Sequence, residues 1–529
     1  MRYSALIAVL VATAGFGYLT LGLPRYFGLF FIISAIFAVI GLRDLFQSNH
    51  ALLRNYPLLA HFRWAIESIR PEIRQYLLES DTEAAPFSRE QRSQVYQRAK
   101  NVNDADPFGT EQNVYAEGYE WLVHSIAAKQ PSETPPRVRV GGPDCTQPYE
   151  ASLLNISAMS FGSLSANAIQ ALNGGAARGG FAHDTGEGSI SRHHKEFGGD
   201  LIWEIGSGYF GCRREDGGFD REQFVERAAD DQVKMIELKL SQGAKPGHGG
   251  VLPGNKVTPE IAEARGIAVG QTCVSPAAHS AFSTPVEMME FIADLREGAG
   301  GKPVGFKLCI GHGWQFMSLA KAMLKTGITP DFIVIDGAEG GTGAAPLELV
   351  DNVGTPLREG LVWAHNTLVG AGLREHIRLG ASGKITSGFK MAANMALGAD
   401  WCNSARGFMF AVGCVQSESC HTDRCPTGVA TQNKWRQRAV VVPDKAERVY
   451  HFHKRTVAAM QEVVATVGLD HPGQLRPEHL CRRTSDREIQ NADQVYRFLH
   501  TGALLNATGH GRYEQAWQMA QSGSFLPKR

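Results

Sequence analysis

The chain opens with two long apolar runs. No charged residue occurs from Tyr3 to Leu23, and the run from Tyr26 to Leu42 is again uncharged, with Pro24 and Arg25 between them. A membrane-spanning helix needs about 20 apolar residues, with about 17 as the lower limit. The first run meets this requirement and the second just reaches it, so the pattern predicts a transmembrane helical hairpin over residues 1–45. A signal peptide and a buried hairpin are the alternatives, and the second run counts against the signal peptide.

Arginines flank the predicted hairpin on both sides. Arg2 precedes it, and Arg43 and Arg54 follow it, while Arg25 lies in the turn. Positively charged residues near spanning helices stay on the cytoplasmic side. Arg25, in the turn, weakens this asymmetry of positive charge. The arginines at both ends still predict a cell-membrane location, with lipid as a partner and the rest of the chain facing the cytoplasm.

The middle of the chain changes to short apolar runs that alternate with longer segments of helical period. Eight such repeats over residues 151–440 predict an α/β fold, a (β/α)8 TIM barrel. A doubly wound open sheet is the alternative, but no GxGxxG follows a strand. Residues 46–150 are polar and mixed and predict a linker or cap, and residues 441–529 predict a helical extension. The strand candidates are LLNISAM, GFAHDT, MIELKLS, GQTCVSP, VGFKLCI, DFIVIDG, HIRLGAS and WCNSARG.

Glycine-rich, polar segments follow several of the predicted strands. In a TIM barrel the functional groups collect at the strand C-termini, and phosphate commonly lies after strands seven and eight. Here the seventh strand ends in ASGKITSG (381–388) and the eighth in SARG (404–407). Gly383 and Gly388 let backbone N–H groups approach an anion, and Arg406 adds a charged fork. For any single segment, the alternative is that its glycines and polar residues only form a tight turn and bind no ligand.

Charge and cysteine content narrow the function. The net charge is zero, so the basic excess of a nucleic-acid-binding protein is missing. Three of the nine cysteines, Cys414, Cys420 and Cys425, fall within twelve residues, and Pro426 follows the last. Thiolates hold iron–sulfur clusters, and proline often follows the last ligand. A zinc site that recruits His421 and three core cysteines are the alternatives.

Several long segments resemble the synthase domain of glutamate synthase over roughly residues 150–470. They are IELKLSQGAKPGHGGVLPGNKV, DGAEGGTGAAPLELV, GLVWAHNTLVGAGLR and GCVQSESCHTDRCPTGVATQ, in the order of the family. With the apolar front, the chain is similar to the stand-alone, membrane-tethered type, the FMN-binding glutamate synthase family proteins. The resemblance implies a [3Fe–4S] cluster on Cys414, Cys420 and Cys425, in a loop over residues 413–432.

The resemblance also implies FMN at the barrel mouth. Met159 and Ser160 would lie beside the isoalloxazine ring, and Lys307 by its N1–C2=O edge, where a cation stabilises the reduced flavin. The ribityl chain and phosphate would be approached by Gly340, Gly341 and the loop from Gly383 to Gly388.

For the substrate, the resemblance implies 2-oxoglutarate over the flavin. Arg265 and Lys245 would clamp its carboxylates, and Glu187 would handle protons as ammonia adds and water leaves. Reduced FMN, fed through the cluster, would then reduce the imine to L-glutamate. The activity implied is that of an oxidoreductase acting on CH–NH2 donors.

The chain departs from the family pattern in the turn KPGHGGVLPG. His248 replaces an acid and Val251 replaces a glutamine that contacts the substrate in the family. The substrate could therefore be another 2-oxo acid or another amine. In the phosphate loop, Thr386 stands where a lysine is common. No cysteine precedes Cys145 to serve as a glutaminase nucleophile, and no NADPH-binding domain is recognised, so an external electron donor such as ferredoxin or another redox protein is expected. The alternatives are a membrane-anchored electron-transfer subunit and an FMN 2-hydroxy-acid oxidase.

Overall fold

The computed structural model describes residues 2–506 and 509–528. These residues form two compact units, Met1–Arg89 and Glu90–Arg529, of which the second holds the barrel.

The first unit is helical. It contains α1 (Ser4–Leu19), α2 (Pro24–Phe46), α3 (Ala51–Asn55), α4 (Leu59–Ile73) and a π-helical turn, η1 (Arg74–Leu78). The first two pack together, and Phe16 of α1 stacks on Phe27 and Phe30 of α2. Within the described residues, one helix, Tyr26–Phe46, is long and apolar enough to cross a membrane. The first apolar run, predicted to span a membrane, forms the 16-residue α1, which ends before Thr20 and Gly22, so the two-helix hairpin stays a prediction.

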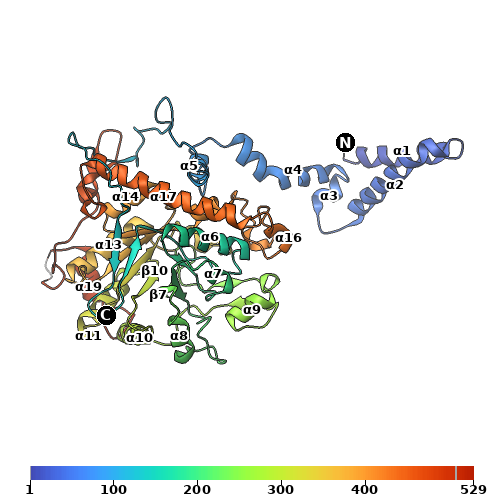
Figure 1. Cartoon of the computed structure of the whole chain (residues 1–529). Helices are drawn as coiled ribbons and strands as arrows, with labels where there is room; N and C mark the ends of the chain where they lie inside the picture. Colours follow the sequence, from blue (N-terminus) through green and yellow to red (C-terminus); the bar gives the residue numbers. More distant parts are fainter. Residues whose placement is uncertain (1, 507–508, 529) are drawn as a thin grey trace. The chain divides into compact units, whose positions relative to one another are not determined.

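The second unit contains a closed, parallel, eight-stranded barrel, which confirms the predicted TIM-barrel fold (Figure 1). Neighbouring strands follow the chain order, and β13 closes the ring by pairing with β4. The strands are β4 (Leu154–Ile156), β5 (His183–Asp184), β6 (Leu201–Ile205), β7 (Val233–Lys239), β10 (Val304–Leu308), β11 (Phe332–Asp336), β12 (Arg378–Ser382) and β13 (Trp401–Ser404).

One predicted strand is wrong. GQTCVSP was expected in the barrel, but its β9 (Cys273–Val274) pairs antiparallel with β8 (Val251–Leu252) outside the ring. The missing barrel strand is β6, LIWEI, in which all five residues are buried. Glu204 interrupts its apolar run and hides it from a hydrophobicity pattern. The expected seventh and eighth strands are confirmed as β12 and β13.

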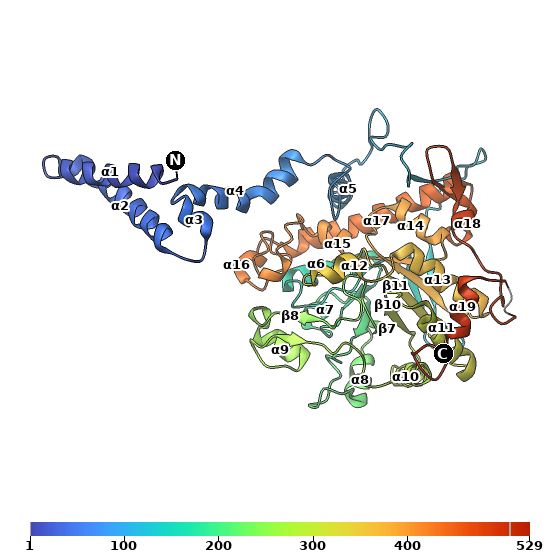
Figure 2. The same ribbon diagram turned by 180° about the vertical axis from the view of Figure 1, so that it is seen from behind.

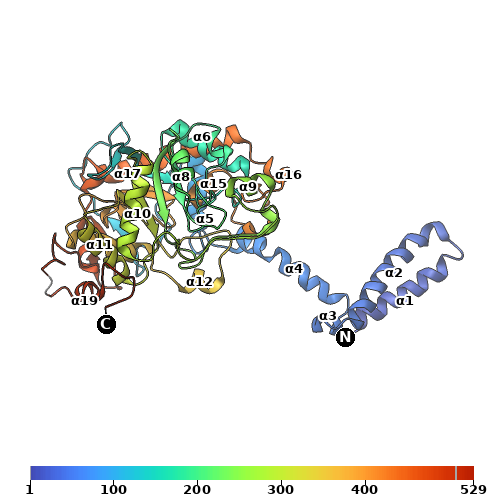
Figure 3. The ribbon, with the colours of Figure 1, turned by 90° about the horizontal axis from the view of Figure 1, so that it is seen from below.

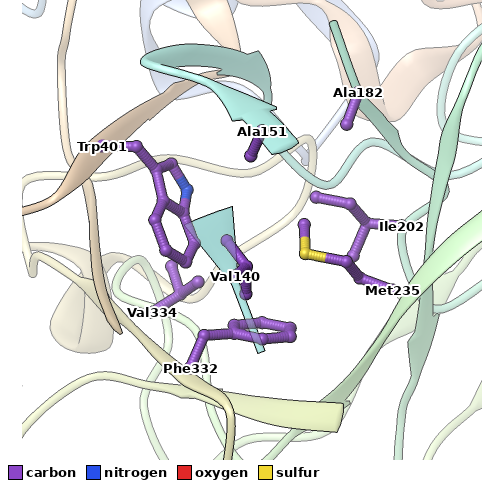
Figure 4. Close-up of a cluster of buried hydrophobic side chains, with 8 residues drawn as sticks. All are labelled: Val140, Ala151, Ala182, Ile202, Met235, Phe332, Val334 and Trp401. Atoms are coloured by element: carbon purple, nitrogen blue, oxygen red, sulfur yellow. The ribbon is translucent and has the colours of Figure 1, made fainter. Parts of the chain in front are cut away.

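A dry apolar layer fills one end of the barrel (Figure 4). The hairpin of β2 (Arg137–Val140) and β3 (Tyr149–Ser152) inserts Val140 and Ala151 there, beside Phe332 and Trp401. Burial of these large side chains contributes roughly 2 kcal/mol each. The hairpin therefore closes the N-terminal end, and the C-terminal end of the strands is left for the site.

The barrel helices form an outer ring. Among them, α10 (Pro285–Gly298) and α11 (Gly313–Thr326) lie side by side (Figure 3). The other helices of this ring and its loops are α6 (Ala166–Gly179), α7 (Arg192–Lys195), α8 (Arg221–Ala228), α9 (Pro259–Arg265), α12 (Leu347–Asn352), α13 (Leu357–Gly370), α14 (Gly388–Ala396), α15 (Arg406–Ala411) and α16 (Lys434–Gln437).

The C-terminal extension packs on this ring. Its long helix α17 (Val442–Val467) lies against α6 and α14 (Figures 1 and 2). A Cβ on Gly175 would lie 2.3 Å from Val449 Cγ1, so glycine permits the close approach. The rest of the extension and the segment before the barrel supply α5 (Arg89–Ala99), β1 (Glu120–Leu122), β14 (Leu480–Arg483), β15 (Ile489–Asn491), α18 (Ala492–Val495) and α19 (Arg512–Met519).

Candidate functional site

Four charged side chains meet at the C-terminal mouth of the barrel. Glu187, in the loop after β5, accepts a hydrogen bond of 2.9 Å from Lys239 Nζ at the end of β7. Burial acts to raise the pKa of Glu187, but the attraction of Lys239, Arg265 and Lys245 outweighs it and lowers this pKa to about 2. Glu187 is therefore ionised at neutral pH. The structure thus brings three predicted residues together, and it adds Lys239, which the sequence analysis missed.

Arg265 and Lys245 reach this place from neighbouring loops. Arg265 ends α9, donates from Nη2 to Ser160 Oγ at 3.3 Å, and lies 5.1 Å from the centre of the Phe210 ring. Its Nε has no hydrogen-bond partner among the described residues. Lys245 donates to the carbonyl of Gly249 at 3.0 Å, and burial lowers its pKa.

A small polar hollow opens beside Glu187. His248, Gly249 and Gly250 of the turn line it. A Cβ on Gly250 would lie 1.5 Å from Glu187 Oε1, so only glycine lets this turn approach the carboxylate. The half-buried Val251 follows directly in β8.

Lys307 lies among acidic side chains in the barrel interior. It is buried on β10, its Nζ is 2.9 Å from Glu237 and 3.8 Å from Asp184, and it is bonded to Glu204. Burial, and then the charge of neighbouring carboxylates, raises the pKa of Asp184, whereas these carboxylates overcome the burial of Lys307 and raise its pKa well above the usual value.

The three acids around Lys307 were also missed by the sequence analysis. They come from β5, β6 and β7, and their oxygens lie within 4.8 Å of one another, close enough to hold a metal ion. The Lys307 ammonium neutralises this position instead. Lys239 lies 3.8 Å from Glu204 and so joins the buried charges to Glu187 at the mouth. The signal in the sequence is an acidic residue two positions after an apolar interior residue, as in Ile202 and Glu204 or Met235 and Glu237.

The loop after β12 concentrates positive charge at the start of α14. Ser387 caps this helix by accepting from the Lys390 N–H. Burial, Lys384 and Arg358 lower the pKa of Lys390 to about 8. The buried Thr386 Oγ1 has no hydrogen-bond partner among the described residues. Together with the N–H groups of the helix start, these groups fit an anion such as phosphate.

The predicted glycines have different surroundings. A Cβ on Gly341 would fall on the Arg406 guanidinium, so the loop after β11 lies directly against Arg406. Gly340 N–H donates to the carbonyl of Gly337, and Gly383 packs on Leu357. For Gly388 the close contact is with α17, since a Cβ would lie 2.4 Å from Met460 N. Met159 is buried, and its backbone lies against Gly186 beside the half-buried Ser160.

The three clustered cysteines lie in one irregular loop after α15. Burial, and then the charges of Cys420 and Cys425, raise the pKa of Cys414 to about 12. For Cys425, burial acts in the same direction, but hydrogen bonds from Ala430 N–H, from Thr427 and from Val429 N–H outweigh it and lower its pKa. These hydrogen bonds therefore favour the thiolate form of Cys425.

The three thiols lie near enough to act on one another electrostatically, since the charges of Cys420 and Cys425 both act on Cys414. The charge of Cys425 also acts on Cys420. The loop therefore gathers three sulfur ligands, which suits either of the two metal alternatives.

The cysteine loop touches the barrel mouth. A Cβ on Gly343 would lie 3.6 Å from Cys420 Cβ and 3.7 Å from Ser163 Oγ, so the loops after β4 and β11 meet the cysteines there. Tyr96 of α5 donates to the Cys414 carbonyl at 2.7 Å. A cluster on this loop would therefore adjoin the mouth.

Comparisons with known proteins agree with this architecture. Residues 143–470 match the family described as the conserved region in glutamate synthase. The chain is 37% identical over 509 residues to the glutamate synthase large subunit-like protein YerD of Bacillus subtilis, covering 88% of this chain and 96% of that protein. It is 32% identical over 315 residues to the archaeal-type glutamate synthase (NADPH) of Thermotoga neapolitana, 59% of each chain. A solved structure of mandelate oxidase with (S)-2-phenylpropionate is similar at a TM-score of 0.41 and 13% identity, covering 76% of this chain and 98% of that one.

The family match spans more than half of the chain, and a relative of similar length matches over nearly its whole sequence. The chain therefore belongs to the glutamate synthase family.

Proposed function

We propose that the protein is a glutamate synthase-type oxidoreductase that forms an amino acid from a 2-oxo acid and ammonia. The observation that carries this proposal is the convergence of Lys239, Lys245 and Arg265 on the ionised Glu187, beside a hollow at the barrel mouth. Three cations around one carboxylate leave positive charge for an anionic substrate, and the cysteine loop adjoins the same mouth.

FMN and a [3Fe–4S] cluster belong to this proposal. The cationic loop at Thr386 and Lys390 fits the FMN phosphate, with Arg406 and Gly341 adjoining it, and Met159 and Ser160 would face the ring. Cys414, Cys420 and Cys425 would hold the cluster. When bound, FMN supplies hydride chemistry and the cluster supplies single-electron transfer.

The charges of the site give Glu187 and Lys245 different roles. Arg265, whose Nε is without a partner among the described residues, would take one substrate carboxylate in a fork. Because the pKa of Glu187 is held near 2, its carboxylate stays ionised and is a weak base, so it would orient the attacking ammonia by accepting a hydrogen bond. Because burial lowers the pKa of Lys245, its ammonium would be the proton donor to the departing hydroxyl.

The membrane and the electron donor complete the proposal. The apolar helices of the first unit would tether the protein to the cell membrane, with the barrel in the cytoplasm. Ferredoxin or another redox protein would supply electrons through the cysteine loop.

The test is flavin reoxidation without air. The detergent-purified protein is reduced with dithionite, freed of excess reductant and mixed with 2-oxoglutarate and ammonium. We expect reoxidation that requires both compounds and yields one glutamate per flavin. Absence of reoxidation with these and with shorter 2-oxo acids, in protein that carries flavin, would refute the proposed reaction.

Val251 is expected to set the choice of 2-oxo acid. Val251→Gln places an amide beside the turn that approaches Glu187, and a hydrogen bond to a carboxylate is worth about 1.5–3 kcal/mol. The ratio of kcat/KM for 2-oxoglutarate to that for 2-oxobutyrate, which lacks the distal carboxylate, should rise at least about tenfold. Val251→Met, of similar size but without the amide, is the control, and an equal rise in that variant would contradict the prediction.

A further inference from the structure

A buried lysine joins the cysteine loop to the substrate turn. Lys256 follows β8 in the turn GNK and is 2% exposed. Its Nζ donates to three carbonyls from different segments, at 3.0 Å to Ser163, 3.3 Å to Cys420 and 3.4 Å to Ala430. One ammonium thus fastens the loop after β4 and both halves of the cysteine loop.

This ammonium has no carboxylate within salt-bridge distance among the described residues. A buried charge is costly unless an opposite charge compensates it. The groups whose negative charge acts on it are Asp423 and, when they are ionised, Cys420 and Cys425, while Arg265 repels it. An iron–sulfur cluster bound by three thiolates is anionic, so it would supply the missing countercharge.

We propose that Lys256 is the counter-cation of the cluster and a positioning residue that sets its reduction potential. This inference rests on the proposed cluster. A fixed positive charge favours the state that carries one more electron, so Lys256 makes the cluster easier to reduce by an external donor. Lys256 ends the short turn that follows β8, the strand that carries Val251, so it also links the cysteine loop to the substrate side of the mouth.

Two neighbouring residues allow the effect of the Lys256 charge to be distinguished from the effect of its hydrogen bonds. Gln432 also links the cysteine loop to the loop after β4, donating to the carbonyls of Gly162 and Leu164 at 3.1 and 2.9 Å, but it is neutral. Asp423 carries the opposite charge, and its Oδ1 accepts from Gln432 N–H and from Thr431. Asparagine at position 423 can keep these bonds.

The experiment is a redox titration of the whole protein, following the cluster by EPR and the flavin by absorbance. Lys256→Met should shift the cluster midpoint to more negative potential with the flavin midpoint unchanged. Asp423→Asn should shift the cluster midpoint the opposite way, and Gln432→Ala should leave it in place. An unchanged cluster midpoint in Lys256→Met with full iron and sulfide would overturn the inference.

Two further outcomes are decisive. If Lys256→Met loses its iron, Lys256→Arg decides: retained iron at the original midpoint supports the need for positive charge, and loss of iron there too refutes it. If the unsubstituted protein binds flavin but no iron, the cluster itself is refuted, which is a different result from failure of Lys256 alone.

Discussion

Cys425→Ser is expected to abolish electron delivery while sparing the flavin. The Cys425 thiolate is stabilised by neighbouring N–H groups, and an alkoxide cannot replace it as an iron ligand at neutral pH. Loss of a direct ligand should reduce turnover driven by an external donor by at least about 100-fold, since even outer-shell changes cost 10–100-fold. Flavin reduced directly by dithionite should still be reoxidised by 2-oxo acid and ammonium.

The measurement compares the two assays and the iron and sulfide contents of the same preparation. Cys481→Ser is the matched control, because Cys481 lies on β14, donates to Asn491 Oδ1 at 3.2 Å, and can be replaced by a hydroxyl that keeps this bond. A Cys425→Ser protein with full iron and full donor-driven turnover would contradict the assignment. If the unsubstituted protein contains zinc and no iron, the cysteine loop is a zinc site.

The second large effect is loss of stability in mild acid. Five histidines of the second unit have lowered pKa values, and burial is the first cause for each. The values are about 3 for His183, His365 and His453 and about 4 for His279, and the pKa of His194 also lies well below the usual 6.5. Each is neutral when folded and takes up a proton when unfolded below pH 6.5.

The sign follows from proton linkage. The unfolded state binds more protons as the pH falls below 6.5, so stability decreases, by about 2 kcal/mol per histidine between pH 7 and pH 5. The raised pKa values of Asp184 and Glu237 act in the opposite direction and offset at most two protons. A net loss of at least about 4 kcal/mol is expected, against a total of about 5–15 kcal/mol for a typical domain. Denaturant unfolding from pH 7.5 to pH 5, followed by circular dichroism, measures it.

His183→Leu isolates one of these protons. Neither ring nitrogen of His183 has a hydrogen-bond partner among the described residues, so the substitution removes the titration at little other cost. The pH dependence should flatten by about 1.4 kcal/mol per pH unit. His376→Gln, at an exposed position, serves as the control. A slope for His183→Leu equal to that of the unsubstituted protein would show that His183 is not held neutral.

The sequence predicted the fold correctly where short apolar runs recur along the chain. Apolar runs located β12 and β13, and hence the loop with Thr386 that follows β12 and the start of α15 at Arg406 that follows β13. It failed at β6, because Glu204 is a charge inside a buried strand, compensated by Lys307 from a strand about a hundred residues away. Neither that ion pair nor the one between Glu187 and Lys239 can be seen until the barrel closes.

The site shows the same limit. Glu187, Lys245 and Arg265 were named from a resemblance, and the structure places them together. Lys307 was placed by the same resemblance at the flavin edge, whereas the structure surrounds it with acids in the barrel interior. Gly388 was read as a partner for phosphate, and its tight contact with Met460 is a long-range feature that no local pattern contains.

The pairing of β13 with β4 also fixes an order of assembly. This last seam joins Cys402 to Leu154, so the ring cannot close until the eighth strand has been synthesised. The cysteine loop comes later still in the chain, and Lys256, which follows β8, ties it to Ser163 in the loop after β4. Contacts between such distant segments form slowly. The cysteine loop is therefore expected to be among the last parts of the unit to take shape.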